Sequence, residues 1–413
     1  MITALCLAAI LLIALSGQVL PSFLTRLGGS SGQQGLLLFS MFLFYPLSSV
    51  LAGAAADRAG KRPVLAAGMA CVGLPFALSA LLPSLAARTA AMLLFGLGEG
   101  VIESQVSALL ADTSPSRERS VMNWSQLMFS IGAAGGPFLI ALLFILPTGA
   151  TVNGVLWACA AAGLLLAALF PLAGGRPAGA AALPSPAAAA QAHRGISAGA
   201  APDARKPGTE ADPEAPGLRT LLRAPGLVLL AMAIFLYVAA EMGTSNWLAK
   251  YGELYLGLPA ELAPVCITVF WGGQSVSRML AGSLSARISD AVLLYGSLLL
   301  TLAGQLLTFS VRAPVAALIG LGLTGVGMGA IWPTLVALAG ARYRRASGQA
   351  IGILTASGGV AVALVQLAIG YLSQPRLLGL RLTLMALAAF TAGNLLVVRR
   401  AIRLRPSRVQ LVR

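Results

Sequence analysis

Glu99 and Glu103 lie one helical turn apart within a long apolar run, in the segment Gly98-Glu99-Gly100-Val101-Ile102-Glu103. Residues four apart face the same side of a helix, so the two carboxylates are neighbours. Two carboxylates this close tend to hold one proton between them, because a second negative charge beside the first is unfavourable. The pair is therefore suited to reversible proton binding, with Glu103 and Glu99 as its carriers. The alternative for Glu103 is a structural hydrogen bond to a neighbouring helix.

The elements that hold these carboxylates are predicted from an apolar composition. The 413 residues are 58% hydrophobic and 10% charged, whereas soluble domains carry about a quarter charged residues. This is typical of an integral membrane protein, whose spanning helices need about 20 apolar residues. We predict an all-α fold of twelve transmembrane helices in two pseudo-symmetric six-helix halves, at 2–25, 33–56, 63–84, 88–111, 121–146, 153–173, 225–248, 263–286, 291–310, 314–340, 348–373 and 382–402.

Composition also divides the chain. We expect an N-terminal half at 1–173, a disordered linker at 174–224 rich in Ala, Pro and Gly, a C-terminal half at 225–402 and a tail at 403–413. Most of the 28 Lys and Arg residues fall on the side that holds both termini. By the positive-inside rule both termini are cytoplasmic in a multi-pass protein of the cell (inner) membrane. The net charge of +15 thus reflects topology, and no nucleic-acid partner is expected.

The inventory of reactive side chains argues against enzyme chemistry. The single histidine, His193, lies in the linker, and the four cysteines fall within predicted spans. Short connections leave no room for a soluble catalytic or nucleotide-binding domain. We therefore expect no metal, no cofactor and no enzymatic activity.

Parts of the sequence recur after 229 residues. The offset superposes Gly53, Arg58, Gly98 and Gly100 on Gly282, Arg287, Gly327 and Gly329. Two related halves are typical of membrane transporters.

A charged segment, 53–62, separates the second and third apolar runs. Gly53 permits close helix approach, Asp57 accepts hydrogen bonds from the N-terminus of a facing helix, and basic residues hold the cytoplasmic surface. Such a latch stabilises one of two arrangements of the halves. We predict gating by Gly53, Asp57, Arg58, Gly60, Lys61 and Arg62, and the alternative is a plain topogenic loop.

The pattern Gly53-x-x-x-Asp57-Arg58-x-Gly60-Lys61-Arg62 resembles the signature between helices two and three of the major facilitator superfamily. The twelve-span layout and the central linker are similar as well. Two positions depart from the pattern, since Ala55 replaces the usual Leu and Ala286 replaces the acid of the second copy. The resemblance implies a secondary carrier that works by alternating access around a central site.

Further segments resemble the fucose, galactose and glucose:proton symporter branch of that superfamily. They are 98–103, Asn123-Trp124-Ser125-Gln126, 237–241 with Asn246-Trp247, Trp271-Gly272-Gly273-Gln274 with Arg278, and Ile331-Trp332-Pro333-Thr334. The resemblance implies that Glu103 couples the proton and binds sugar. The fucose carriers also use an acid on helix one, whereas this chain offers Gln18 there.

Polar and aromatic residues in the spans complete the predicted site. An ionisable group near the bilayer centre costs at least about 2.5 kcal/mol on insertion scales, so each needs a cavity or a partner. Aromatic rings suit the apolar face of a sugar. We predict substrate contacts for Gln18, Glu103, Asn123, Gln126, Glu241, Asn246, Trp247, Gln274, Arg278 and Trp332.

Three of these residues keep an alternative. Glu241 would otherwise form an ion pair at an outer gate, Arg278 would snorkel or pair with an acid, and a tryptophan would anchor the membrane interface. Trp332 stands at the repeat position of Glu103, where a ligand site needs chemically different walls.

The function expected from these residues is uptake of a sugar or similar polar solute by a monomeric carrier in the lipid bilayer. Coupling is to a cation, a proton first and sodium as the alternative. A second possibility is export of amphipathic compounds, because Gly132-Ala-Ala-Gly-Gly-Pro137 resembles half of a drug antiporter signature. Helix packing is the other use for those glycines. A membrane receptor that does not transport is a third possibility.

Overall fold

The computed structural model describes residues 2–82, 84–113, 118–173, 218–284 and 288–404. Within these ranges the regular structure is helical. The first half comprises α1 (Ile2–Gly17), α2 (Val19–Ser22), α3 (Ser31–Leu43), α4 (Tyr45–Ala59), α5 (Lys61–Leu81), α6 (Leu85–Thr113), α7 (Glu118–Ile145) and α8 (Val152–Leu172). The second comprises α10 (Leu218–Leu222), α11 (Pro225–Ser245), α12 (Leu248–Leu256), α13 (Val265–Leu284), α14 (Asp290–Ser310), α15 (Pro314–Met328), α16 (Ile331–Arg342), η2 (Arg344–Ala346), α17 (Ser347–Leu372) and α18 (Gly379–Arg403).

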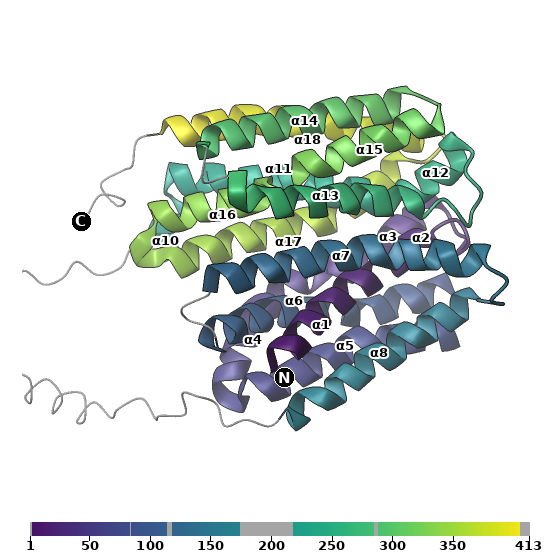
Figure 1. The fold of residues 1–413 in the computed structure, drawn as a ribbon, viewed down its shortest axis with the longest axis horizontal. Helices are drawn as coiled ribbons and strands as arrows, with labels where there is room; N and C mark the ends of the chain where they lie inside the picture. Colours follow the sequence, from purple (N-terminus) through teal and green to yellow (C-terminus); the bar gives the residue numbers. More distant parts are fainter. Residues whose placement is uncertain (1, 83, 114–117, 174–217, 285–287, 405–413) are drawn as a thin grey trace, which may run out of the picture.

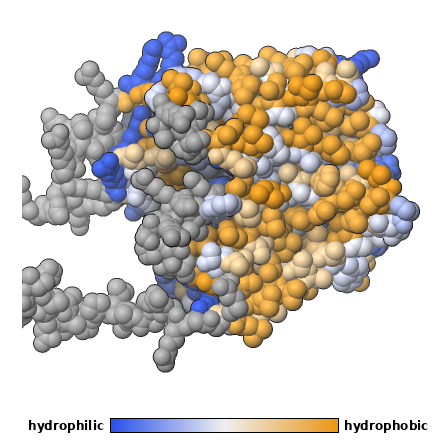
Figure 2. All heavy atoms as spheres, viewed as in Figure 1, coloured by the Kyte–Doolittle hydropathy of each residue, from blue (hydrophilic) through white to orange (hydrophobic). Residues whose placement is uncertain are grey.

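The helices run side by side along the long axis, with the first half and the second half stacked against each other (Figure 1). Helix α1 begins and α18 ends at the same end of the bundle, which we call the termini end. Figure 2 shows a surface that is hydrophobic across its middle and hydrophilic at its two ends. This distribution fits a bundle whose middle is covered by lipid.

Among the described residues, eleven helical segments are long and apolar enough to cross a membrane. Helix α13 is not one of them, although its 20 residues are sufficient in length. It carries Gln274 and Arg278 in its middle, and these polar residues lower its hydropathy. With α13 as the remaining span, the helices match the twelve predicted ones. Helix α10 lies within the range expected to be a disordered linker; residues 174–217, including His193, lie outside the described part.

Four spans are broken, which the sequence analysis did not predict. The breaks fall at Gln18, at Phe44, at 246–247 and at 329–330. Proline lacks the N–H that would bond the carbonyl four residues earlier. Pro21, Pro46 and Pro333 follow three of the breaks within two to four residues. The break at 246–247 has no such proline, but it stands at the repeat position of the break at Gln18.

The two halves are tied together at the end opposite the termini, which we call the closed end. Its polar contacts are Thr25 Oγ1 to Glu253 at 2.6 Å, Arg26 to Glu261 at 2.7 Å, and Lys250 Nζ to Gln34 Oε1 at 2.6 Å and to Ser31 Oγ at 2.9 Å. Helices α3 and α17 also cross closely there. A Cβ added to Gly35 would lie 2.7 Å from the Cα of Gly370, so only glycines permit this crossing.

The segment 53–62 covers the end of α4, the linking residue Gly60 and the start of α5. Gly60 has a φ of 87°, a left-handed conformation that favours glycine. Asp57 and Arg58 are exposed, and Lys61 Nζ donates to the carbonyl of Ala108 at 3.2 Å within the same half. The close helix approach expected at Gly53 is absent here, because a Cβ at that position would meet nothing among the described atoms within 4 Å. The repeat counterpart Arg287 lies outside the described residues.

Candidate functional site

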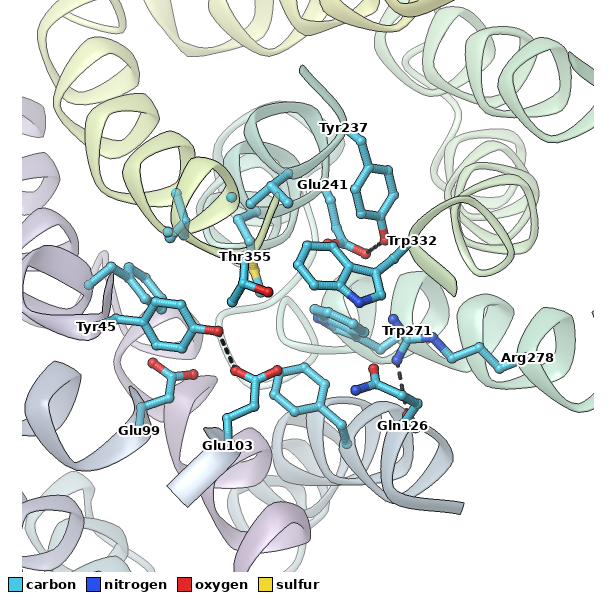
Figure 3. Close-up of a pocket in the computed structure, with 17 residues that line it drawn as sticks. Tyr45, Glu99, Glu103, Gln126, Tyr237, Glu241, Trp271, Arg278, Trp332 and Thr355 are labelled. Atoms are coloured by element: carbon cyan, nitrogen blue, oxygen red, sulfur yellow. Dashed lines mark hydrogen bonds between the residues drawn. The ribbon is translucent and has the colours of Figure 1, made fainter. Parts of the chain in front are cut away.

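A cavity lies between the halves, with about 620 Å³ of empty space that includes space open to solvent. Helices α3, α4, α6 and α7 supply one wall, and α11, α13, α16 and α17 supply the other. The lining residues are Phe42, Tyr45, Glu99, Glu103, Gln126, Phe129, Tyr237, Val238, Glu241, Met242, Trp271, Arg278, Trp332, Thr355, Gly358, Gly359 and Val362. Figure 3 shows their side chains converging from both halves.

The wall from the first half carries the two carboxylates that are predicted to bind a proton reversibly. Both Glu99 and Glu103 line the cavity from α6. The hydroxyl of Tyr45 donates to Glu103 Oε2 at 2.5 Å (Figure 3). Glu99 is 6% exposed, and its Oε2 has no hydrogen-bond partner in the described part of the protein. The two carboxylates also interact electrostatically.

The opposite wall carries a third carboxylate. Glu241 Oε1 accepts hydrogen bonds from the hydroxyl of Tyr237 and from Gln274 Nε2, the latter at 2.8 Å. Glu241 and Glu103 are close enough to interact with each other and with Arg278. The cavity thus has a carboxylate held by a tyrosine on each side.

Arg278 bridges the halves at the level of the cavity. It belongs to α13, and its NH1 donates to the carbonyl of Gln126 at 3.0 Å and to Ser130 Oγ, both on α7 of the other half. Its Nε is buried and has no partner within the described residues. The charge of Arg278 therefore faces two carboxylates while its hydrogen bonds hold the two halves together.

Trp271 connects the cavity to the closed end. Its ring packs edge to face on Phe129 of the other half, with centroids 5.7 Å apart. Its Nε1 donates to Ser245 Oγ at 2.7 Å, and Ser245 donates to Gln18 Oε1 at 3.3 Å across the halves. These hydrogen bonds connect Trp271 to the breaks of the first and seventh spans.

Six predicted residues line the cavity, namely Glu99, Glu103, Gln126, Glu241, Arg278 and Trp332. Gln274 lies behind it and orients Glu241, and Gln18 lies at the first break. Asn246 and Trp247, expected to contact substrate, are fully buried away from the cavity. The chain turns after α11 ends at Ser245, and Trp247 Nε1 donates to Gln366 of α17 at 3.0 Å. The side chain of Asn123 lies outside the described part.

Several lining residues were missed, although the 229-residue repeat held a signal for three of them. The offset pairs Tyr45 with Gln274, Phe42 with Trp271 and Thr355 with Gln126. One member of each pair, Gln274, Trp271 or Gln126, belongs to a segment singled out in the sequence. The other member occupies the corresponding position in the other half of the protein. Tyr237 stands one turn before Glu241, so helical spacing alone points to it.

Comparisons with known proteins agree with this architecture. A family model described as Major Facilitator Superfamily matches residues 2–288. An uncharacterized MFS-type transporter of Yersinia pestis is 22% identical over 380 residues, which cover 91% of this chain and 88% of that protein.

Solved structures with the same fold include three transporters. A D-xylose-proton symporter has a TM-score of 0.75 at 13% identity, over 99% of this chain and 98% of the other. The nucleoside transporter NupG has a TM-score of 0.72 at 12% identity, over 98% and 100%. An inward-facing bacterial homologue of the human lysosomal transporter Spinster has a TM-score of 0.72 at 13% identity, over 97% and 96%. The predicted twelve-helix fold is confirmed; at these identities the likeness bears on fold alone.

Proposed function

Since this chain belongs to the Major Facilitator Superfamily and is one of its transporters, we propose that it carries a sugar together with a proton by alternating access. The observation that supports this most is the cavity between the halves, where the Glu99–Glu103 pair faces aromatic and amide side chains. A proton and a small polar solute would share this one space.

The chemistry of the walls supports a sugar. A pyranose has an apolar C–H face that stacks on rings and hydroxyls that need donors and acceptors. Trp332 and Trp271 offer the rings, and Gln126, Thr355 and Glu103 offer polar atoms. The D-xylose-proton symporter, which has the same fold, is named for such a substrate.

Coupling to a proton rests on the first wall. In our proposal the Glu99–Glu103 pair takes up a proton when the cavity opens to one side and releases it to the other. The hydrogen bond from Tyr45 to Glu103 would change in strength with this proton, because the hydroxyl bonds most strongly when the carboxylate is ionised. Sodium is the alternative ion, and the transport experiment below separates the two.

The proposed membrane orientation places both termini in the cytoplasm of the cell membrane. The closed end then faces outward, and the solute leaves toward the cytoplasm in this arrangement. The segment 53–62 would act as a latch in the opposite arrangement, when the termini end closes and Gly53 approaches the other half. The linker 174–224 joins two halves that move as units within a monomer.

The glycines that suggested an exporter have another use in this structure. Gly136 lies against α1, where an added Cβ would be 2.7 Å from the carbonyl oxygen of Leu15, and Gly132 packs in the same way on Leu11. These residues hold α7 on α1 within one half. The resemblance to an antiporter signature therefore gives no support to export.

Uptake of labelled hexoses into proteoliposomes tests the proposal. We expect uptake to increase with an inwardly directed proton gradient and to be unaffected by a sodium gradient. Glu103→Gln should abolish the response to pH, whereas Asp290→Asn, which removes an exposed acid far from the cavity, should leave it unchanged. Uptake that is absent for every hexose would refute the sugar assignment. Uptake that stays pH-driven in Glu103→Gln would refute the coupling role.

A further inference from the structure

The cavity contains more acidic than basic side chains. Its lining includes Glu99, Glu103 and Glu241 but a single arginine, Arg278, among the described residues. With one proton shared by Glu99 and Glu103, one negative charge remains after Arg278 is counted. A charge left uncompensated in a site screened from water is unfavourable. The cavity therefore favours a solute with a positive group and disfavours a solute with a negative one.

Glu99 is the carboxylate that lacks a partner. Glu103 and Glu241 each accept a hydrogen bond from a tyrosine hydroxyl. Glu99 lines the same cavity and is 6% exposed, but its Oε2 has no partner in the described structure. An ammonium group has three donors and a positive charge, so it would supply both the hydrogen bond and the compensating charge that this oxygen lacks. A sugar hydroxyl supplies a hydrogen bond but no charge.

The rings around the cavity favour the same group. The aromatic lining residues are Phe42, Tyr45, Phe129, Tyr237, Trp271 and Trp332. The faces of such rings attract cations, most strongly where water is excluded. Figure 3 shows Glu99 beside Tyr45 and Glu103, and Glu99 is close enough to interact electrostatically with both.

We propose that the cavity selects sugars that carry a protonated amine, with the ammonium seated at Glu99; this rests on the sugar function proposed above. The ammonium compensates the one negative charge that remains when Glu99 and Glu103 share a proton, whereas a neutral sugar leaves that charge uncompensated. An amino sugar is therefore carried together with the coupling proton.

Matched pairs of sugars test the selection by calorimetric titration of the purified protein. The pairs are glucose with glucosamine, galactose with galactosamine, and mannose with mannosamine, and glucuronate serves as the anionic probe. Near neutral pH we expect the amine of a binding pair to bind tighter than its hydroxyl partner by on the order of tenfold. Glucuronate should not bind. Above about pH 9, where a sugar amine is neutral, the advantage should disappear.

Two variants locate the ammonium. Glu99→Gln should bring the affinity ratio of amine to hydroxyl close to one, whereas Asp290→Asn, an exposed acid outside the cavity, should keep the wild-type ratio. The pH series on the unaltered protein needs no variant, so a misfolded Glu99→Gln leaves the proposal testable.

The outcomes separate this inference from the proposed function. A hexose that binds as tightly as its amine overturns the amine selection and leaves the sugar function standing. Binding of simple alkylamines without any sugar binding supports the charge selection and overturns the sugar function. Failure of sugars and alkylamines alike overturns both.

Discussion

Replacing Gly370 by alanine should push the two halves apart at the closed end. Helices α3 and α17 cross there, and the new Cβ would lie 2.7 Å from the Cα of Gly35 and 2.8 Å from the carbonyl oxygen of Ser31. Ordinary Cβ contacts begin at 3.4 Å. Both obstacles are backbone atoms, so the helices must separate rather than a side chain rotate.

The size of the effect follows from the cost of overpacking. Extra methyl groups in a packed interface cost about 1–3 kcal/mol. This cost applies to the arrangement that is closed at this end and vanishes when the end opens. A difference of that size changes the ratio of the two arrangements by about 5-fold to 150-fold.

The change would be measured as the distance between spin labels on Thr148 and Arg312, two exposed residues near the closed end, one in each half. Pulsed electron paramagnetic resonance in nanodiscs gives this distance. The longer distance should gain population in Gly370→Ala. Gly352→Ala is the matched control, because it lies on the same helix and a Cβ there meets nothing within 4 Å among the described atoms. An unchanged distance distribution in Gly370→Ala, or an equal change in Gly352→Ala, would refute the reasoning.

Three further predictions concern Lys250, Tyr45 and Arg278. Burial lowers the pKa of Lys250, which lies in α12 beyond the seventh span, from 10.5 to about 8, because burial penalises the protonated form. The arrangement that is closed at this end should therefore gain population in the spin-label experiment as pH rises from about 8 toward 10.5. Lys250→Met should remove this pH dependence. Tyr45→Phe keeps the ring but removes the donor to Glu103, so the pH profile of uptake should shift while the Kd for sugar changes by about fivefold or less, roughly the effect of one neutral hydrogen bond of about 1 kcal/mol. Arg278→Lys loses the guanidinium NH1 that donates to both Gln126 and Ser130, and uptake should fall by about tenfold or more.

Controls for these predictions come from the same elements. Ser275→Ala on α13 removes a hydroxyl whose bond, within the described residues, is to the carbonyl of Trp271 on the same helix, and uptake should stay near wild type. If Arg278→Lys transports as well as Ser275→Ala, the bridge to α7 has no role in transport. If Tyr45→Phe leaves the pH profile unmoved, the Tyr45–Glu103 bond does not influence the coupling proton. If the pH response persists in Lys250→Met, another group causes it.

Much of the fold could be predicted because membrane insertion imposes local rules. Apolar runs of sufficient length marked the spans, and α13 was found although Gln274 and Arg278 lower its hydropathy. The breaks were not predicted. A proline marks where a carbonyl loses its partner, but other prolines, such as Pro75 and Pro137, lie inside continuous helices. Packing against neighbouring helices decides which proline breaks a helix.

The site was predictable where the cost of burial marks a residue. Glu99, Glu103, Glu241 and Arg278 stood out because charged groups in apolar helices need a cavity or partners. Tyr45 and Phe42 did not stand out, because aromatic residues are common throughout membrane spans. Trp247 and Asn246 had suitable chemistry, but the turn after Ser245 buries both side chains, and Trp247 bonds to Gln366 of α17 instead.

By itself, then, the sequence determined the class of protein, its two related halves and the acids that need a shared cavity, because these depend on composition, spacing and the cost of burying charge. Only the tertiary structure decided which residues meet across the halves: Tyr45 on Glu103, Arg278 on α7, and Lys250 on Gln34. These contacts join residues far apart in the chain, and no local pattern records them. The physical reason is that helix packing sets the crossing points, and a one-turn shift along a helix would bring different side chains together.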